Sequence, residues 1–221
     1  MVPAFIFDLN GTIIDDMNFH VQAWSHLLNG ELGASMDYEA VKAQMYGKNS
    51  ELLIRVFGEG RFTEEEMNEL SIKKETIYQS IYKPHLRLID GLGAFLAKSQ
   101  AAKIPMAVGS AAIMFNIDFI LDNLNIREYF GALVSADNVR RSKPDPETFT
   151  MAAHLLGVKP ENCLVFEDAP KGVETARNAG MKVVVILSAL HSEEEFAGFD
   201  NITRFIKSYD EVSPSELIAA L

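Results

Sequence analysis

The sequence is poor in cysteine and in basic residues, and it lacks any long apolar run. Its one cysteine, Cys163, excludes an internal disulfide and lies in an apolar segment, as expected of a buried strand thiol in a reducing compartment. The 20 Lys and Arg residues face 31 Asp and Glu, and the formal charge of -11 has the wrong sign for general binding to nucleic acid or an anionic membrane. No run approaches the ~20 apolar residues of a membrane span, and the first one stops at Asp8 without a basic leader. We therefore expect a soluble cytoplasmic protein with no obligate protein partner evident.

Apolar segments of strand length recur along the chain. With 48% hydrophobic residues, the 221-residue chain can bury a substantial core. Helix-length segments separate the candidate strands, and this alternation predicts an α/β fold built on a doubly wound parallel sheet. The predicted strands are Ala4–Leu9, Ile104–Gly109, Ala132–Ser135, Cys163–Glu167 and Lys182–Leu187.

One long segment interrupts this alternation. Residues 15–84 contain no convincing strand but carry apolar side chains at helical spacing, such as Leu52 and Val56. We therefore predict a small helical domain here, inserted into an α/β core that residues 1–14 and 85–221 form. Linkers at its two ends would let the insert rock over the strand ends.

Acidic runs in the chain have an ordinary structural explanation. In each, a serine or threonine stands three positions before a glutamate, the pattern in which the two side chains cap the start of a helix. The runs are Thr63–Glu66, Ser192–Glu195 and Ser213–Glu216. We assign them to helix starts and not to a binding site.

The segment Phe5–Thr12 places an acidic side chain where a buried strand should end. Its sequence Phe-Ile-Phe-Asp-Leu-Asn-Gly-Thr runs from apolar residues into a turn, with Asp8 at the junction. Ligands of α/β folds bind at the open edge beyond the carboxyl ends of the strands. Because Asp, Asn and Gly are common in any tight turn, the pattern taken alone favours an ordinary turn.

Phe5–Thr12 resembles, however, the DxDGT nucleophile motif of the haloacid dehalogenase superfamily. Further segments match the motifs of that family in the same order along the chain. They are Val108-Gly109-Ser110, Ser142-Lys143-Pro144-Asp145-Pro146 and Phe166-Glu167-Asp168. The resemblance implies a Rossmann-like core whose active site is covered by the helical insert, a cap domain.

The resemblance also implies roles for the motif residues. Asp8 would attack phosphorus and form an aspartyl phosphate, which divides one displacement into two steps. Mg²⁺ would offset the negative charge of the site, held by the Asp8 carboxylate, the backbone carbonyl at Asn10 and the pair Glu167 and Asp168. Without the other motifs, this pair would be an ordinary strand end.

Ser110 and Lys143 match the phosphate-binding positions of the family. The Ser110 hydroxyl and the amides of Ala111 and Ala112 would donate to phosphate oxygens at the start of a helix. The prolines after Lys143 keep the backbone non-helical and would direct its ammonium group at the phosphoryl group. Outside this family, the serine would be a helix cap and the lysine a solvated surface residue.

Asn10 departs from the family pattern. Phosphotransferases of the family carry here a second aspartate, which protonates the leaving oxygen and later deprotonates the attacking one. An asparagine amide can hydrogen bond but cannot exchange a proton, so a step worth ~10²- to 10⁴-fold is lost. We expect slow turnover, or an acid supplied by the cap, the substrate or water. Dehalogenases also lack this aspartate but need no metal, so Glu167 and Asp168 favour phosphoryl transfer.

The start of the insert suggests a substrate. Asp15–Trp24 resembles the first cap helix of β-phosphoglucomutases and related sugar-phosphate phosphatases, which have His and Trp at the spacing of His20 and Trp24. That spacing puts both side chains on one helix face. His20 could sense the substrate or shuttle a proton, and Trp24 could pack on it; alternatively, both are packed core residues.

Two other parts of the insert are candidates for substrate binding. The loop Gly47-Lys48-Asn49 lies near the position of a substrate-binding basic residue of the mutases, and Lys74 aligns with a cap lysine of theirs. Phosphonate hydrolysis would need a cap lysine that forms a Schiff base, and Lys48 and Lys74 have no supporting motif for that role.

The resemblance thus implies a Mg²⁺-dependent phosphotransferase that acts on a small phosphorylated metabolite, with a sugar phosphate in first place. Hydrolysis is the leading reaction. A β-phosphoglucomutase is the alternative, which His20, Trp24 and Lys74 favour and Asn10 disfavours. A further alternative is a protein that binds phosphorylated metabolites but has lost turnover through Asn10.

Overall fold

The computed structural model of the protein describes residues 3–187 and 191–219. The chain divides into two compact units. Residues 1–15 and 87–221 form the first, which we call the core unit, and residues 16–86 form the second, the insert unit. The predicted helical insertion into an α/β core is confirmed.

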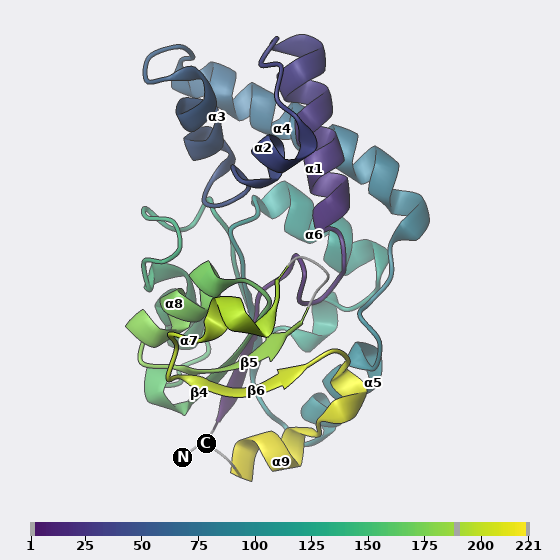
Figure 1. Ribbon diagram of the computed structural model, residues 1–221. Coiled ribbons are helices and arrows are strands. Elements are labelled where there is room, and N and C mark those ends of the chain that lie inside the picture. Colours follow the sequence, from purple (N-terminus) through teal and green to yellow (C-terminus); the bar gives the residue numbers. More distant parts are fainter. Residues whose placement is uncertain (1–2, 188–190, 220–221) are drawn as a thin grey trace. The chain divides into compact units, whose positions relative to one another are not determined.

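The core unit is built on a six-stranded parallel sheet in the order β3-β2-β1-β4-β5-β6 (Figure 1). The order reverses between β1 and β4, the point at which sheets of this topology bind ligands. The strands are β1 (Ala4–Phe7), β2 (Met106–Gly109), β3 (Ala132–Val134), β4 (Cys163–Glu167), β5 (Lys182–Ile186) and β6 (Ile202–Ile206).

The predicted strands are all present, but most are shorter than the apolar runs. β1 ends at Phe7 and not at Leu9, because the carbonyl of Leu9 accepts the amide of Ile13 and closes a turn. Leu9 is nevertheless buried, so the apolar run correctly indicates which residues are buried but not where strand pairing ends. The sixth strand, β6, was not predicted. It lies at the sheet edge with Thr203 and Arg204 exposed, and so lacks an apolar run.

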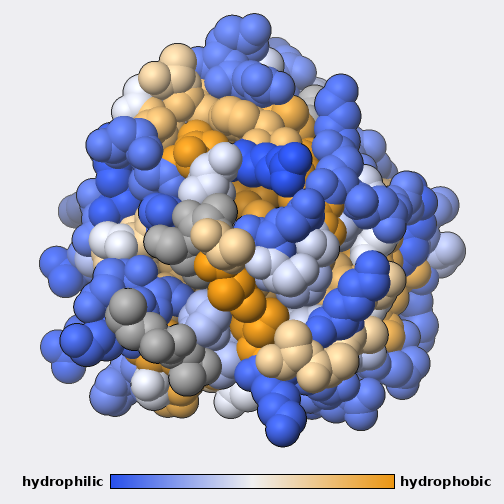
Figure 2. Space-filling model, turned by 90° about the horizontal axis from the view of Figure 1, so that it is seen from below, coloured by the Kyte–Doolittle hydropathy of each residue, from blue (hydrophilic) through white to orange (hydrophobic). Residues whose placement is uncertain are grey.

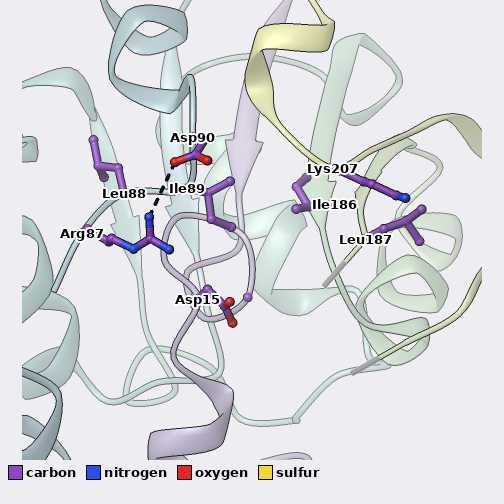
Figure 3. A pocket seen from close by; sticks show the side chains of 9 residues that line it. Asp15, Arg87, Leu88, Ile89, Asp90, Ile186, Leu187 and Lys207 are labelled. Carbon is purple, nitrogen blue, oxygen red and sulfur yellow. Dashed lines mark ion pairs between the residues drawn. The ribbon is translucent and has the colours of Figure 1, made fainter. Parts of the chain in front are cut away.

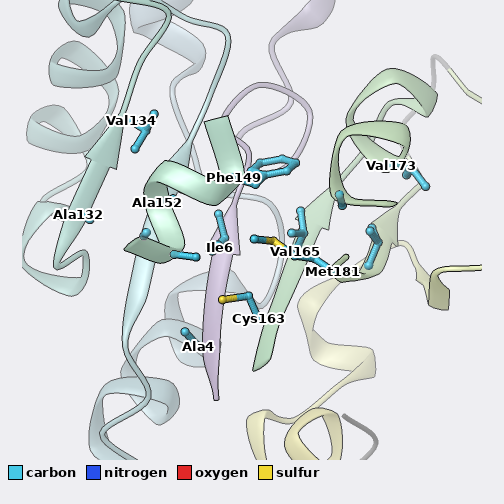
Figure 4. Close-up of a cluster of buried hydrophobic side chains, with 14 of the residues drawn as sticks. Ala4, Ile6, Ala132, Val134, Phe149, Ala152, Cys163, Val165, Val173 and Met181 are labelled. Carbon is cyan, nitrogen blue, oxygen red and sulfur yellow. The ribbon is translucent and has the colours of Figure 1, made fainter. Parts of the chain in front are cut away.

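One face of the sheet packs on helices α7 (Glu147–Leu155) and α8 (Pro170–Asn178). Ile6 of β1 and Val165 of β4 point to this face, where Phe149 of α7 covers them (Figure 4). Cys163 is a free thiol within the same buried cluster, as predicted.

The opposite face carries a cluster of aromatic side chains. Phe5 and Phe7 point here because successive side chains of a strand alternate between faces. The ring of Phe7 stacks on that of Phe166 at 4.5 Å, and Phe5 stacks on Phe95 of α5 (Leu92–Ala101) at 5.6 Å. Both faces are thus covered, which explains why every residue of β1 is buried and the strand reads as a continuous apolar run.

Short elements complete the core unit. They are α6 (Met114–Asn123), α9 (Pro214–Ala219) and the 3₁₀ turns Arg127–Tyr129, Pro160–Asn162, Glu193–Phe196 and Tyr209–Glu211. Ile14 and Leu88 form an antiparallel bridge, so the two ends of the core unit at which the insert departs and returns are paired by backbone.

The insert unit, all of which the structure describes, contains helices and no strand. Its helices are α1 (Met17–Ser25), α2 (Tyr38–Lys42), α3 (Asn49–Phe57) and α4 (Glu64–Tyr82), with a π-helical turn at His26–Glu31 and a 3₁₀ turn at Lys83–His85. Its apolar core includes Val21, Trp24, Leu52 and Leu53, and Val56 packs against it. The helical spacing recognised in the sequence therefore marks the buried face.

The capping assignments are confirmed. The Thr63 hydroxyl accepts the amide of Glu66 at 3.2 Å, and the Glu66 carboxylate accepts the amide of Thr63 at 2.7 Å. Ser213 and Glu216 make the same reciprocal bonds before α9. Ser192 does so with Glu195, at the start of a 3₁₀ turn.

Charged and polar side chains cover most of the surface seen in Figure 2. Within residues 3–187 and 191–219, no helix combines the length and the apolar character needed to cross a membrane.

Candidate active site

Asp8 lies directly after β1, beside the point where the strand order reverses. Its amide donates to the carbonyl of Phe166 at 2.9 Å and extends the β1–β4 ladder one residue beyond β1. The chain then turns through Gly11, whose φ of 75° lies in the left-handed region. The carboxylate is therefore held at the carboxyl edge of the sheet.

Lys143 places a buried ammonium group between two carboxylates. Its Nζ lies 2.8 Å from Oδ1 of Asp8 and 2.8 Å from Oε1 of Glu167. The Phe149 ring lies 4.5 Å from the same nitrogen and adds a cation–π contact. With 8% of its side chain exposed, Lys143 is not the solvated surface residue of the alternative interpretation.

Asp8 and Lys143 shift each other's pKa values. Burial raises the pKa of Asp8 to about 6; the Lys143 ammonium opposes this rise, and the Glu167 charge adds to it. Burial also disfavours the charged form of Lys143, but Asp8 and Glu167 outweigh it and raise the pKa of this lysine. At neutral pH the lysine is charged and Asp8 is mostly ionised, the state that a nucleophilic carboxylate requires.

Both carboxylate oxygens of Glu167 accept hydrogen bonds from other residues of the core unit. Oε1 accepts from Lys143, and Oε2 accepts the amide of Ala169 at 2.6 Å. Gly172 in the first turn of α8 leaves room for this side chain, since a Cβ there would lie 1.6 Å from Oε1. Glu167 thus positions Lys143.

Asp168 lies against the loop that follows β1. A Cβ at Gly11 would lie 2.0 Å from Oδ2 of Asp168, so the contact and the positive φ both require glycine at this position. The contact brings the loops after β1 and β4 together, as expected of two neighbouring strand ends.

Ser110 follows β2, and its amide donates to the carbonyl of Val134 at 2.9 Å. The expectation that Ser110 and the next amides lie at a helix start is wrong. The Ser110 hydroxyl accepts the amide of Ala112 at 3.1 Å and closes a turn, while α6 begins only at Met114. Ala111, between the two, is half-buried.

The oxygen donors at this edge fit a magnesium ion. Among the described residues, no three His, Cys, Asp or Glu side chains are grouped as a metal centre. Mg²⁺, however, is commonly bound by one or two carboxylates and completes its shell with water and substrate oxygens. Asp8 and Asp168, with the backbone of Asn10 in the intervening loop, can supply such a set, whereas the oxygens of Glu167 are engaged elsewhere.

The insert unit contains a buried group of polar side chains, which we call the polar cluster: Asp16, His20, Asn49, Lys74, Glu75 and Tyr78. His20 lies at its centre, with Nε2 at 3.1 Å from Oδ2 of Asp16 and Nδ1 at 2.6 Å from Nζ of Lys74. The His20 ring stacks on Tyr78 with 3.8 Å between centroids. Lys74 also donates to Oε1 of Glu75 at 2.9 Å.

The polar cluster reaches the predicted substrate loop through Asn49, which donates to Oε1 of Glu75 at 3.0 Å. Gly47 has a φ of 73°, and Lys48 is the N-cap residue of α3, with its amide donating to Glu51. Trp24 belongs instead to the apolar core, as in the packed alternative, and Nζ of Lys74 lies 5.3 Å from its ring.

Asp16, Glu75 and Tyr78 were not predicted from the sequence as members of a site. Asp16 precedes His20, and Lys74 precedes Tyr78, by the four residues that align side chains on a helix. This spacing was the available signal. It did not stand out because charged residues are common along α4.

A pocket of about 170 Å³ lies at another part of the carboxyl edge of the sheet (Figure 3). It is lined by Gly11, Asp15, Arg87, Leu88, Ile89, Asp90, Ile186, Leu187 and Lys207. Its charged groups include the exposed ion pair between Arg87 and Asp90, 3.7 Å apart. The pocket shares Gly11 with the loop that follows β1, but Asp8 is not among its lining residues.

Known proteins are similar to this chain in sequence and in fold. The family model of the haloacid dehalogenase-like hydrolases matches residues 5–186. Fructose-1-phosphate phosphatase YqaB of Escherichia coli (strain K12) is 35% identical over 184 residues, which cover 82% of this chain and 94% of that protein. Beta-phosphoglucomutase of Bacillus subtilis (strain 168) is 32% identical over 189 residues, covering 83% and 82%. The crystal structure of beta-phosphoglucomutase from Clostridium difficile matches with a TM-score of 0.83 at 26% identity, covering 98% and 96%. The chain therefore belongs to the haloacid dehalogenase-like hydrolase family.

Proposed function

We propose that this hydrolase is a Mg²⁺-dependent phosphatase of a small phosphorylated sugar, with Asp8 as its nucleophile. The observation that carries the proposal is the buried ammonium group of Lys143, held by Glu167 at 2.8 Å from the Asp8 carboxylate. An anionic nucleophile can approach a phosphoryl group only where positive charge offsets the repulsion. The similarity to a fructose-1-phosphate phosphatase supports a sugar phosphate as the substrate.

In the proposed reaction, the Asp8 carboxylate attacks phosphorus as the bond to the leaving oxygen breaks. Water then attacks the aspartyl phosphate, which releases phosphate and restores Asp8. Lys143 offsets charge throughout, and the Ser110 hydroxyl donates to a phosphate oxygen. Mg²⁺, held by Asp8, Asp168 and the backbone carbonyl at Asn10, would neutralise charge on the phosphoryl oxygens.

We propose that the insert unit is the cap and contributes to substrate binding. Lys48 and Asn49, with Gly47 before them, are the candidates for contacting the sugar, since Lys48 is half-buried in a loop. Trp24 packs in the apolar core, so we propose it as a substrate-binding residue only where its ring lies near Lys74. A cytoplasmic location remains a prediction, with which the free thiol of Cys163 agrees.

The test is phosphate release from a panel of sugar phosphates, nucleotides, pyrophosphate and p-nitrophenyl phosphate, with Mg²⁺ or EDTA. Asp8→Asn removes the nucleophile while keeping its shape, and Asp15→Asn is a matched control because Asp15 is an exposed carboxylate. We expect Mg²⁺-dependent release from a sugar phosphate by the unchanged protein and by Asp15→Asn, and none by Asp8→Asn. Equal release by Asp8→Asn would refute the proposal.

A mutase is the second candidate, since a beta-phosphoglucomutase is 32% identical over most of both chains. A mutase needs a sugar bisphosphate to sustain turnover and yields an isomeric sugar phosphate instead of free phosphate. Following substrate and product by ³¹P NMR, with and without the bisphosphate, separates the two reactions. If the unchanged protein forms neither product, and phosphate is released only after Asn10→Asp, the result supports the third candidate, a protein that binds phosphorylated metabolites without turnover.

A further inference from the structure

A buried hydrogen bond joins the loop after β1 to the 3₁₀ turn Tyr209–Glu211. The Tyr209 hydroxyl donates to the backbone carbonyl of Thr12 at 3.1 Å, across 197 positions of the sequence. Thr12 is fully buried, Tyr209 is 1% exposed, and both belong to the core unit. The bond therefore lies inside one unit, and none of the sequence motifs includes Tyr209.

The ring of Tyr209 is fixed in the aromatic cluster on one face of the sheet. Its centroid lies 5.4 Å from that of Phe95, 5.6 Å from that of Phe166 and 6.3 Å from that of Phe7. The backbone is held as well, because the amide of Tyr209 donates to the carbonyl of Asp90 at 2.9 Å. A hydroxyl on a ring so confined has little freedom to leave its acceptor.

Tyr209 anchors the middle of the loop after β1. Other segments hold the two ends of this loop: the amide of Asp8 donates to the end of β4 at 2.9 Å, and the carbonyl of Ile13 accepts the amide of Ile89 at 3.0 Å. Thr12 lies between those ends. Its buried carbonyl needs a donor, since leaving such a group unpaired costs free energy. Without the hydroxyl, the loop would have to shift until water reached this carbonyl.

The Tyr209 hydroxyl acts as a donor and lies near the candidate active site. Burial raises the pKa of Tyr209 well above its ordinary value, and the charges of Asp168 and Asp8 add to that rise. The hydroxyl therefore keeps its hydrogen at neutral pH. The same two carboxylates are the proposed nucleophile and a proposed Mg²⁺ ligand, so the contact with Thr12 supports the loop close to the proposed chemistry.

We propose that Tyr209 is a positioning residue of the proposed phosphatase, which holds the loop after β1 in the shape that binds Mg²⁺. This inference rests on the proposed function. The carbonyl of Asn10, a proposed metal ligand, lies two residues before the carbonyl that Tyr209 holds. A movement of Thr12 therefore displaces the Asn10 carbonyl relative to Asp8 and Asp168, and it weakens the proposed site.

A purely structural role of the hydroxyl makes a different prediction. If the hydroxyl only adds to the stability of the core, its removal lowers the free energy of unfolding but leaves the folded loop and its affinity for Mg²⁺ unchanged. If it positions the loop, its removal loosens the loop locally and weakens Mg²⁺ binding in molecules that stay folded. Exchange of single backbone amides with solvent separates the two roles.

The test compares the unchanged protein with Tyr209→Phe, which keeps the ring and removes only the oxygen. The amides of Gly11 and Ile13 bond within the loop at 2.8 Å. In the metal-free variant we expect them to exchange roughly 5- to 100-fold faster, the factor that corresponds to one buried carbonyl left unpaired. An NMR titration with Mg²⁺ alone should give a Kd that is ~3- to 10-fold higher. Phosphate release should fall by a similar factor at low Mg²⁺ and recover as Mg²⁺ is raised to saturation.

Tyr129→Phe is the matched control. Tyr129 is half-buried in the core unit, and its hydroxyl makes no hydrogen bond to a residue that the structure describes. The control should leave amide exchange, the Kd for Mg²⁺ and phosphate release unchanged. If Tyr209→Phe does not fold, Gly91→Ala takes its place, because the new Cβ would lie 2.5 Å from the amide nitrogen of Asp210 and displace the turn while the hydroxyl stays present.

An unchanged exchange rate at Gly11, or an unchanged Kd for Mg²⁺, in the folded variant would overturn the inference. Absence of phosphate release from both the unchanged protein and Asn10→Asp would instead contradict the proposed function. Amide exchange in the metal-free protein decides even then whether Tyr209 holds the loop.

Discussion

Replacing Gly172 by alanine should separate activity from helix stability. Gly172 lies in the first turn of α8, where alanine is the better helix former by ~1 kcal/mol. Its Cβ would, however, lie 1.6 Å from Oε1 of Glu167 and 1.9 Å from Cδ of the same side chain. The Glu167 carboxylate must therefore move, and it then leaves Nζ of Lys143, which it now contacts at 2.8 Å.

The size of the effect follows from this contact. A hydrogen bond between charged groups contributes ~1.5–3 kcal/mol, so the gain in helix propensity should be outweighed and the protein destabilised by ~0.5–2 kcal/mol. If Lys143 also loses its position in the transition state, the same energy lowers kcat/KM by roughly 10- to 100-fold.

The assays are phosphate release with the substrate identified from the panel and unfolding in urea. Gly93→Ala is the matched control, because Gly93 lies in the first turn of α5 and its Cβ would meet only Cδ1 of Leu88 at an ordinary 3.5 Å. We expect Gly93→Ala to keep full activity and to be at least as stable as the unchanged protein. Full activity in Gly172→Ala would show that Glu167 does not need to hold Lys143.

Two further predictions concern single buried groups. Cys163 should resist alkylation in the folded protein at mildly alkaline pH, because it is fully buried and its thiol stays protonated. Burial, with a smaller effect of Glu161, raises the pKa of this thiol to about 11. Mass spectrometry should detect labelling only in urea, and rapid labelling of the native protein would contradict the prediction. Lys143→Met should abolish phosphate release and lower the free energy of unfolding by ~3–5 kcal/mol, because it leaves Asp8 and Glu167 buried without their counter-charge. An unchanged urea midpoint would argue against this role of Lys143.

The central strands could be predicted because burial on both faces leaves little choice of residue. β1 and β4 are apolar along their length, and polar residues can appear only where the chain leaves the sheet, as at Asp8 and Asp168. An edge strand such as β6 carries no such constraint. The position of β6 depends on backbone pairing with β5, and the exposed side chains of Thr203 and Arg204 do not indicate that pairing.

The composition of the polar cluster could not be predicted for a different reason. The bond from Tyr78 to Asp16 joins residues 62 positions apart, and only the packing of α1 on α4 brings them together. The spacing of His20 and Trp24 predicted a shared helix face, but it did not indicate which of them faces polar partners. Trp24 contacts the apolar core and His20 contacts charged groups because α4 places Lys74 beside His20.

The bridge between Ile14 and Leu88 bears on how such a protein can change during evolution. The amide of Ile89 donates to the carbonyl of Ile13 at 3.0 Å, so the chain leaves the core and returns to it across a single pair of neighbouring backbones. Doubling the length of a flexible loop costs only ~0.6 kcal/mol in closure entropy. An insert of another length or sequence can therefore replace residues 16–86 at little cost to the core. Under the proposed function, new substrate specificities can arise in this insert while the residues at the strand ends keep the same reaction.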